Sequence, residues 1–114
     1  IVTDDKPRAR DLVRKGFAPY YATPVYNDFL AWAGHEDVAK TISEGWAAKD
    51  REKTTGALGD ALVDDIAILG SMDECQDRIR EYGEGGITTH IISCVSPTES
   101  QATFNAFTGS MFAY

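Results

Sequence analysis

The feature that most constrains the fold is a short pattern that occurs twice: an apolar run, a serine, two further residues and a glutamate. It occupies residues 71–74 within ILGSMDEC and residues 96–99 within SCVSPTES. In this spacing the serine hydroxyl accepts a hydrogen bond from the backbone N–H three residues on. The glutamate reaches back to the N–H of the serine, which completes a capping box. The pattern predicts that a helix begins twice, each time directly after an apolar segment.

The two apolar segments predict strands, at residues 66–69 (IAIL) and 87–95 (ITTHIISCV), the second rich in β-branched residues. Four apolar residues between them recur at helical spacing: Met72, Cys75, Ile79 and Tyr82. They predict a helix over 71–83 that ends at GEGG. With a last helix over 97–113, the pattern predicts a β-α-β-α unit with parallel strands and a right-handed crossover.

The N-terminal half predicts mainly helices. The expected segments are helices over 5–22, 23–34 and 35–49, a polar loop over 50–56 and a short helix over 57–65. Residues 1–3 (IVT) resemble the stump of a strand, which would make the opening a third copy of the pattern; a frayed terminus is the alternative. We therefore expect one partial domain, with a mainly helical segment at 1–60 and the β-α-β-α unit at 61–114.

Composition narrows the possible binding partners and the cellular location of the protein. The net charge of −7 and the pI near 4.6 argue against a nucleic-acid partner. No apolar stretch has the length of a membrane span, so no membrane partner is expected. Cys75 and Cys94 are too few for a disulfide framework. Their positions in apolar segments indicate reduced core cysteines of a cytosolic protein, and we expect a cytoplasmic location.

Exposed edges predict self-association. Two or three parallel strands make a small sheet with unpaired edges, which invite pairing with another chain. An aromatic cluster at helical spacing offers a second surface: Tyr20, Tyr21, Tyr26, Phe29 and Trp32. Core packing is the alternative role for this cluster.

Two segments carry a resemblance to a known family. Residues 61–100 read ALVDDIAILGSMDECQDRIREYGEGGITTHIISCVSPTES and resemble the C-terminal region of luciferase-like monooxygenases. The nearer resemblance is to the branch that uses coenzyme F-420, a deazaflavin. Residues 2–34 read VTDDKPRARDLVRKGFAPYYATPVYNDFLAWAG and are similar to the family's Asp-containing strand end, its Arg-bearing helix and its Tyr-rich segment.

The resemblance implies an α/β fold, the helix-rich C-terminal part of a (β/α)8 TIM barrel that ends in the β-α-β-α unit. It implies an oxidoreductase that transfers a hydride between coenzyme F-420 and a small organic substrate, with an FMN-dependent monooxygenase as the alternative. The main cofactor contacts in the family come from earlier strands. We therefore expect this chain alone to bind neither cofactor tightly and to be inactive.

In such barrels the site lies at the C-terminal ends of the strands. The residues at those positions are Gly70, Ser71, Ser93, Cys94 and Ser96. A cofactor phosphate could use the free N–H groups of the helices that follow them. Helix capping alone is the alternative for the serines at 71 and 96, and no histidine or lysine is identified that would activate the thiol at 94.

Other residues give weaker signals for catalysis or metal binding. His90 could donate a proton, although a lone histidine in a strand is more often structural. The acidic pair Asp4 and Asp5 fits a role at a helix N-terminus. No spacing of His, Cys or Asp predicts a metal site. A non-catalytic interaction or assembly module, which would use the strand edges and the aromatic cluster, is the second functional reading.

Overall fold

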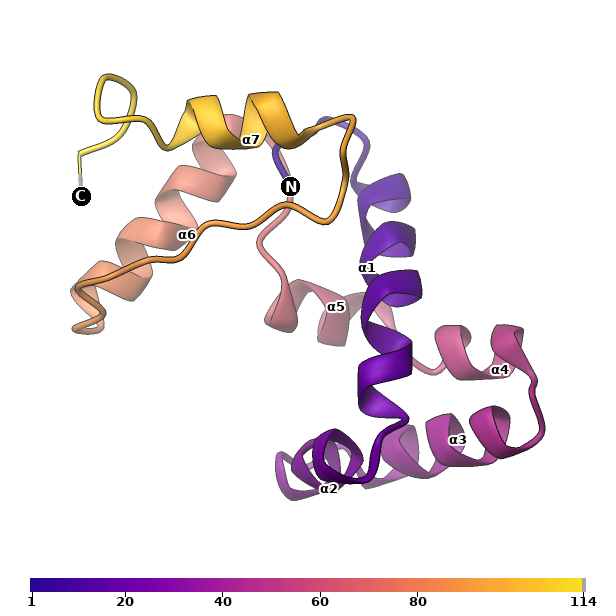
Figure 1. The fold of residues 1–114 in the computed structure, drawn as a ribbon. Coiled ribbons are helices and arrows are strands. Elements are labelled where there is room, and N and C mark those ends of the chain that lie inside the picture. Colours follow the sequence, from indigo (N-terminus) through magenta and orange to yellow (C-terminus); the bar gives the residue numbers. More distant parts are fainter. Residues whose placement is uncertain (114) are drawn as a thin grey trace. The chain divides into compact units, whose positions relative to one another are not determined.

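The structure, a computed structural model, describes residues 1–113 (Figure 1). Its helices are α1 (Lys6–Tyr21), α2 (Pro24–Trp32), α3 (Glu36–Ala47), α4 (Arg51–Gly56), α5 (Asp60–Ile66), α6 (Met72–Glu84) and α7 (Ser100–Ala106). The chain forms two compact units. The terminal unit contains Ile1–Arg10 and the described residues from Asp64 onward, and the central unit is Asp11–Val63. Within the described part of the chain, no helix has both the length and the apolar character needed to cross a membrane.

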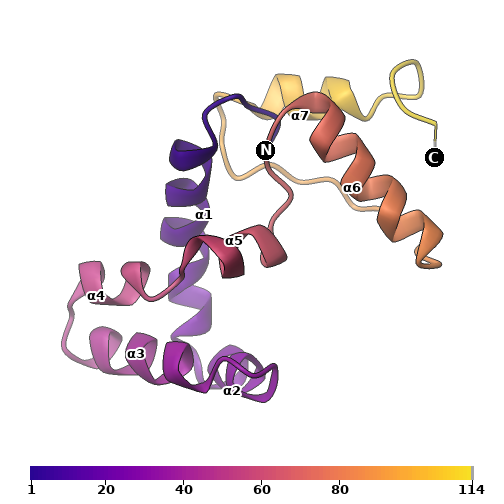
Figure 2. The ribbon, with the colours of Figure 1, turned by 180° about the vertical axis from the view of Figure 1, so that it is seen from behind.

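The central unit is built around α3, which contacts both α2 and α4 (Figure 2). Its largest fully buried side chains are Val13, Leu30, Ile42, Leu58 and Val63. Asn27 ties α2 to its neighbours because its side-chain amide donates to the carbonyl of Tyr21 (3.0 Å) and to that of Ala39 (2.8 Å). The helices predicted over 5–22, 23–34, 35–49 and 57–65 are confirmed, with ends displaced by one to three residues.

The polar loop predicted over 50–56 is wrong, because residues 51–56 form α4. Asp50 is the N-cap, and its carboxylate accepts from the backbone N–H of Lys53 (2.9 Å). The hydroxyl of Thr54 donates to the Asp50 carbonyl (2.7 Å). A capping aspartate thus begins a helix in a segment that composition alone assigned to a loop.

In the terminal unit, the first capping box is confirmed. The hydroxyl of Ser71 accepts from the backbone N–H of Glu74 (3.3 Å), and the Glu74 carboxylate accepts from the backbone N–H of Ser71 (2.8 Å). The apolar stripe of α6 buries Cys75 and Ile79 in a cluster whose other buried members are Val2, Ala106, Phe107 and Phe112. The helix predicted over 71–83 therefore forms and packs as expected.

The predicted β-α-β-α unit is wrong. Residues 66–69 and 87–95 do not pair, and the bridge among the described residues joins Val2 to Gly70 in parallel. The backbone of Thr3 donates to the Gly70 carbonyl (2.7 Å), and that of Gly70 donates to the Ile1 carbonyl (3.1 Å). The opening residues thus pair as the third copy predicted, although over a single bridge. A sheet of two or three short parallel strands offers too few backbone partners and too little cover to persist.

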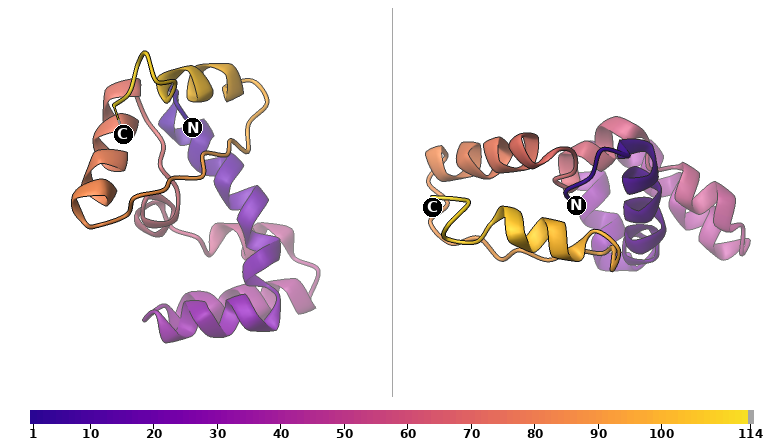
Figure 3. Two further views of the ribbon diagram at one scale, coloured as in Figure 1. Left: turned by 60° about the vertical axis from the view of Figure 1, so that its left-hand side comes forward. Right: turned by 90° about the horizontal axis from the view of Figure 1, so that it is seen from above.

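Residues 87–95 form an extended connection between α6 and α7 (Figure 3). Burial alternates along it: His90, Ile92 and Cys94 are half-buried, whereas their odd-numbered neighbours are exposed, and Ile91 is 93% exposed. This period of two is that of a strand. The local pattern predicted from sequence is present, but the neighbouring strand is not.

The helix predicted over 97–113 is shorter, at Ser100–Ala106, and the second capping box is wrong. The Ser96 hydroxyl bonds to the Glu99 carboxylate rather than to the Glu99 backbone N–H. That carboxylate also pairs with Arg8. Because Glu99 is drawn to these two side-chain partners, it becomes the N-cap itself and makes no side-chain cap hydrogen bond.

Candidate functional site

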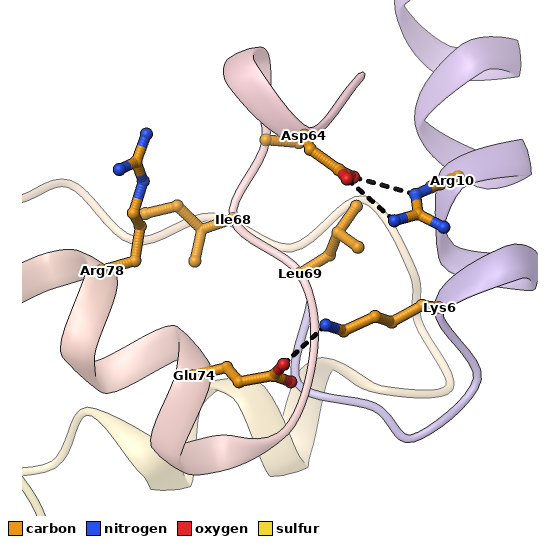
Figure 4. Close-up of a pocket in the computed structure, with 8 residues that line it drawn as sticks. Lys6, Arg10, Asp64, Ile68, Leu69, Glu74 and Arg78 are labelled. Atoms are coloured by element: carbon orange, nitrogen blue, oxygen red, sulfur yellow. Dashed lines mark hydrogen bonds and ion pairs between the residues drawn. The ribbon is translucent and has the colours of Figure 1, made fainter. Parts of the chain in front are cut away.

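A polar cavity of about 210 Å³ lies in the terminal unit, and Figure 4 shows the side chains that line it. Its lining residues are Lys6, Arg10, Asp64, Ala67, Ile68, Leu69, Glu74 and Arg78. The first two turns of α1 provide two of the cations. Lys6 Nζ donates to Glu74 Oε1 (2.6 Å), and the Arg10 guanidinium makes two parallel hydrogen bonds to the Asp64 carboxylate (2.9 and 2.8 Å). Such a bidentate pair fixes the planes of both groups.

The electrostatics of this cavity keep its glutamate ionised. The hydrogen bond from Lys6, reinforced by the backbone N–H of Ser71, lowers the pKa of Glu74 from 4.5 to about 2. A carboxyl group with this pKa is a carboxylate throughout the neutral range and cannot supply a proton there. Nearby, burial raises the pKa of the Cys75 thiol, which therefore stays protonated. Neither Glu74 nor Cys75 is therefore poised for acid–base or thiolate chemistry at neutral pH.

Two of the predicted site residues, Gly70 and Ser71, lie at the edge of this arrangement. Gly70 has a φ of +142°, and a Cβ at this position would lie 2.4 Å from Glu74 Oε2. Glycine is therefore required both by the backbone conformation and by the approach of the carboxylate. The backbone N–H groups of residues 71 and 74 are used within the capping box. An anionic carboxylate thus occupies the place where a phosphate would have to bind, and this helix start does not fit one.

The other predicted site residues lie beside the start of α7. Ser93 is exposed, whereas Ser96 is 1% exposed. The Cys94 thiol donates to the Ser96 carbonyl (3.3 Å) and accepts from the Thr103 hydroxyl (3.6 Å). The hydroxyl of Thr103 also accepts from the backbone N–H of Val2 (3.0 Å).

The structure therefore places the five predicted residues in two groups, one at each helix start. The link between the groups is Val2, which pairs with Gly70 and donates to Thr103. In both groups the hydroxyl, thiol and N–H groups described above are engaged in internal hydrogen bonds, and Ser93 alone is exposed. Their assignment as cofactor contacts stays a prediction.

Sequence reasoning missed the cations of α1. Lys6, Arg8 and Arg10 pair with Glu74, Glu99 and Asp64, respectively. The available signal was the run KPRAR: side chains two apart on a helix point in different directions, so each cation reaches a different carboxylate. Within residues 1–113, no group of three or more His, Cys, Asp or Glu side chains could hold a metal ion.

Comparison with known protein families gives a match over most of the chain. Residues 1–89 match the family described as Luciferase-like monooxygenase. The matched range includes all of α1 to α6 and the polar cavity, and it ends before Ser93. No curated protein and no solved structure matches the chain.

Proposed function

This chain belongs to the luciferase-like monooxygenase family, an oxidoreductase family whose members use flavin-type cofactors, and we propose that it serves hydride transfer between coenzyme F-420 and a small organic substrate. The observation that carries the proposal is the family match over residues 1–89. The resemblance of residues 61–100 to the F-420 branch supports the choice of cofactor, and FMN with oxygen activation is the alternative.

The role we propose for these residues is that of the C-terminal, helix-rich part of a barrel. The parallel bridge at Gly70, followed directly by the capped helix α6, has the order of a barrel βα unit. A closed barrel of this kind requires eight strands. The two helix starts do not form a phosphate cradle, so the main contacts to the cofactor would come from other strands, and these residues would support the barrel wall.

The proposal is tested with two proteins: the 114-residue chain, and the product of the longest open reading frame that contains it. Each is titrated with F-420 and with FMN, with binding followed by cofactor fluorescence and turnover by the absorbance of the reduced cofactor. We expect micromolar F-420 binding and reduction in the longer product, and weak binding without turnover in the 114-residue chain.

Each other outcome has a defined meaning. Binding of FMN in preference to F-420 would replace the proposed cofactor. Binding of neither cofactor to a longer product with eight βα units would overturn the oxidoreductase proposal. Turnover by the 114-residue chain itself would overturn the supporting role and show that the site is contained within it. A reading frame that begins at residue 1 would favour the second candidate function.

The second candidate is an assembly module without catalysis, and residues 87–95 favour it. This extended segment exposes Ile87, Ile91 and Val95, and its backbone N–H groups at 88, 89 and 91–95 make no backbone hydrogen bond in the described structure. A second copy of the chain could satisfy these groups by pairing with the segment as a strand. Self-association in the absence of any cofactor binding would separate this function from the first.

A further inference from the structure

The largest hollow described in the central unit surrounds Trp46. It has a volume of about 690 Å³ and is lined by Lys15, Ala18, Pro19, Trp46, Arg51, Glu52, Thr54 and Thr55, which come from α1, α3 and α4. A second hollow of about 330 Å³ shares Trp46, Arg51 and Thr54 with the first and adds Lys49. Small-molecule sites typically have volumes of about 300–1,000 Å³. Trp46 is 52% exposed, so much of its surface is accessible to a ligand.

Two of the helices that line this hollow, α3 and α4, pack closely against each other. A Cβ at Gly45 would lie 2.7 Å from Thr54 Oγ1, so only glycine allows α3 and α4 to approach this closely. The turn between the helices is held by the backbone N–H of Asp50, which donates to the Gly45 carbonyl (2.8 Å). Lys49 adopts a φ of +56°, the left-handed conformation in which helices commonly end, and this turn fixes its place beside Trp46.

The charges around Trp46 are mainly positive. Lys15, Lys49 and Arg51 line the two hollows, and in the described structure none of them makes a side-chain hydrogen bond or an ion pair. Two carboxylates oppose these cations: Glu52, and Asp50, which accepts from the backbone N–H of Lys53. Three cations without a partner are unexpected in a chain whose net charge is −7.

We propose that this hollow binds a small planar aromatic anion, of the class of a ring carrying a phosphate, such as a mononucleotide. The indole of Trp46 stacks on the ring, because stacking on an aromatic side chain requires only a planar π-face. Arg51 binds the phosphate, since a guanidinium can donate two parallel hydrogen bonds to it, and Lys15 and Lys49 add point charges. This site is independent of the proposed oxidoreductase function.

The ligand class follows from the combination of these features. A neutral aromatic molecule would leave the three cations without a role, and a simple anion would leave the exposed indole without one. The overall negative charge disfavours a nucleic-acid strand, whose phosphates repeat at short intervals. A single phosphate contacts only the local cations, so the same objection does not apply to it.

The test uses tryptophan fluorescence of the 114-residue chain, which contains two tryptophans. Trp32→Phe leaves Trp46 as the only indole, and Trp46→Phe leaves Trp32 as a matched reporter elsewhere in the central unit. Both variants are titrated with AMP, adenosine and ribose 5-phosphate. We expect saturable quenching of Trp46 by AMP, binding of adenosine and of ribose 5-phosphate at least tenfold weaker, and no saturable quenching of Trp32.

Charge variants in the Trp32→Phe background complete the test. We expect Arg51→Gln to weaken AMP binding about tenfold and Lys15→Gln about threefold, whereas Lys40→Gln, a cation of α3 outside both hollows, leaves it unchanged. Circular dichroism verifies that each variant is folded. Equal affinities for AMP and adenosine, equal quenching of both reporters, or an equal loss in Lys40→Gln would overturn the proposal. Because the readout needs neither F-420 nor FMN, its failure is distinguishable from failure of the oxidoreductase proposal.

Discussion

The carboxylate of Glu74 holds together the start of α6 and the start of α1. One oxygen accepts from Lys6 Nζ and the other accepts from the backbone N–H of Ser71. The two donors differ in the acceptor that they require at position 74. A neutral amide oxygen can still accept from the backbone of Ser71, but only a charged carboxylate forms an ion pair with Lys6.

We expect Glu74→Gln to lower the melting temperature near pH 7 by removing the ion pair while keeping the capping hydrogen bond. Because the folded-state pKa of Glu74 is depressed from 4.5 to about 2, the stabilisation is fully present above pH 4.5 and is lost as the pH falls towards 2. Melting curves of both proteins between pH 7 and pH 2 test this. The difference in melting temperature should close across that window, and a constant difference would contradict the ion-pair explanation.

Ser71→Ala should lower the free energy of unfolding by about 1 kcal/mol, as the loss of a helix cap does. Ser96→Ala should also cost about 1 kcal/mol, because it removes a hydrogen bond made by a buried hydroxyl. Ser43→Ala is the control, since this exposed serine on α3 makes no described side-chain hydrogen bond. Urea unfolding monitored by circular dichroism measures all three. A loss for Ser43→Ala as large as for Ser71→Ala would remove the capping explanation.

At the scale of elements, Gly70 determines how α6 follows the bridge to Val2. Its φ of +142° turns the chain into the helix, and its missing side chain admits the Glu74 carboxylate. Gly86, which follows the same helix, has a φ of +95° but nothing within 4 Å of a Cβ. At both positions a residue other than glycine would have a strained backbone. Only at position 70 would its side chain also clash with a neighbour.

We expect Gly70→Ala to destabilise the protein more than Gly86→Ala. Both substitutions incur backbone strain of roughly 1–3 kcal/mol, and the clash with Glu74 adds to the cost at position 70 alone. Chemical denaturation of the two variants measures the difference. A second comparison, of Gly70→Ala with and without Glu74→Ala, isolates the clash: the cost at position 70 should fall when the carboxylate is removed.

Local signals in the sequence predict most of the helices. Periodic apolar residues and a capping box identify α6, because both depend on residues within one turn of each other. α4 is missed because its sequence, REKTTG, is polar and its cap lies outside the apolar pattern. Sheet pairing is predicted wrongly because strand neighbours are chosen by contacts far apart in sequence, such as Val2 with Gly70.

The sequence predicts the helix start beside the polar cavity but not the chemistry of that cavity. Gly70 and Ser71 do mark a helix start next to a polar cavity, as a strand-to-helix pattern indicates. The sequence could not show that Glu74 fills the anion position, because this depends on Lys6, which lies 68 residues away. Side chains that meet across such distances leave no periodic signal.

At the scale of the whole molecule, two exposed apolar surfaces are candidates for the self-association that the sequence predicts. One is the extended segment at 87–95, with Ile91 93% exposed, and the other is α2, with Trp32 81% and Val25 75% exposed. An extended segment with unpaired backbone N–H groups, such as those of residues 91–95, can gain both hydrogen bonds and apolar contacts from a second copy. A helix face gains apolar contacts alone.

We therefore expect Ile91→Lys to shift the chain towards the monomer, whereas Val25→Lys, which adds the same charge to α2, has a smaller effect. Size-exclusion chromatography with light scattering, over a range of protein concentrations, provides the measurement. A larger shift for Val25→Lys would identify α2 as the associating surface. A wild-type chain that is monomeric at all concentrations would exclude both.

The terminal unit is built from two separate stretches of the chain, and this affects the order in which the chain folds during synthesis. The central unit, Asp11–Val63, is continuous and can close as soon as its last residue has left the ribosome. Ile1–Arg10 leave the ribosome before the central unit, yet the backbone of Val2 bonds to Thr103, and Arg8 pairs with Glu99. Ile1–Arg10 must therefore wait until residues 99–103 have been made, exposed to proteases and chaperones in the meantime. Limited proteolysis of ribosome-stalled chains should cut near residue 5 until α7 has emerged, and protection of a chain stalled before α6 would contradict this order.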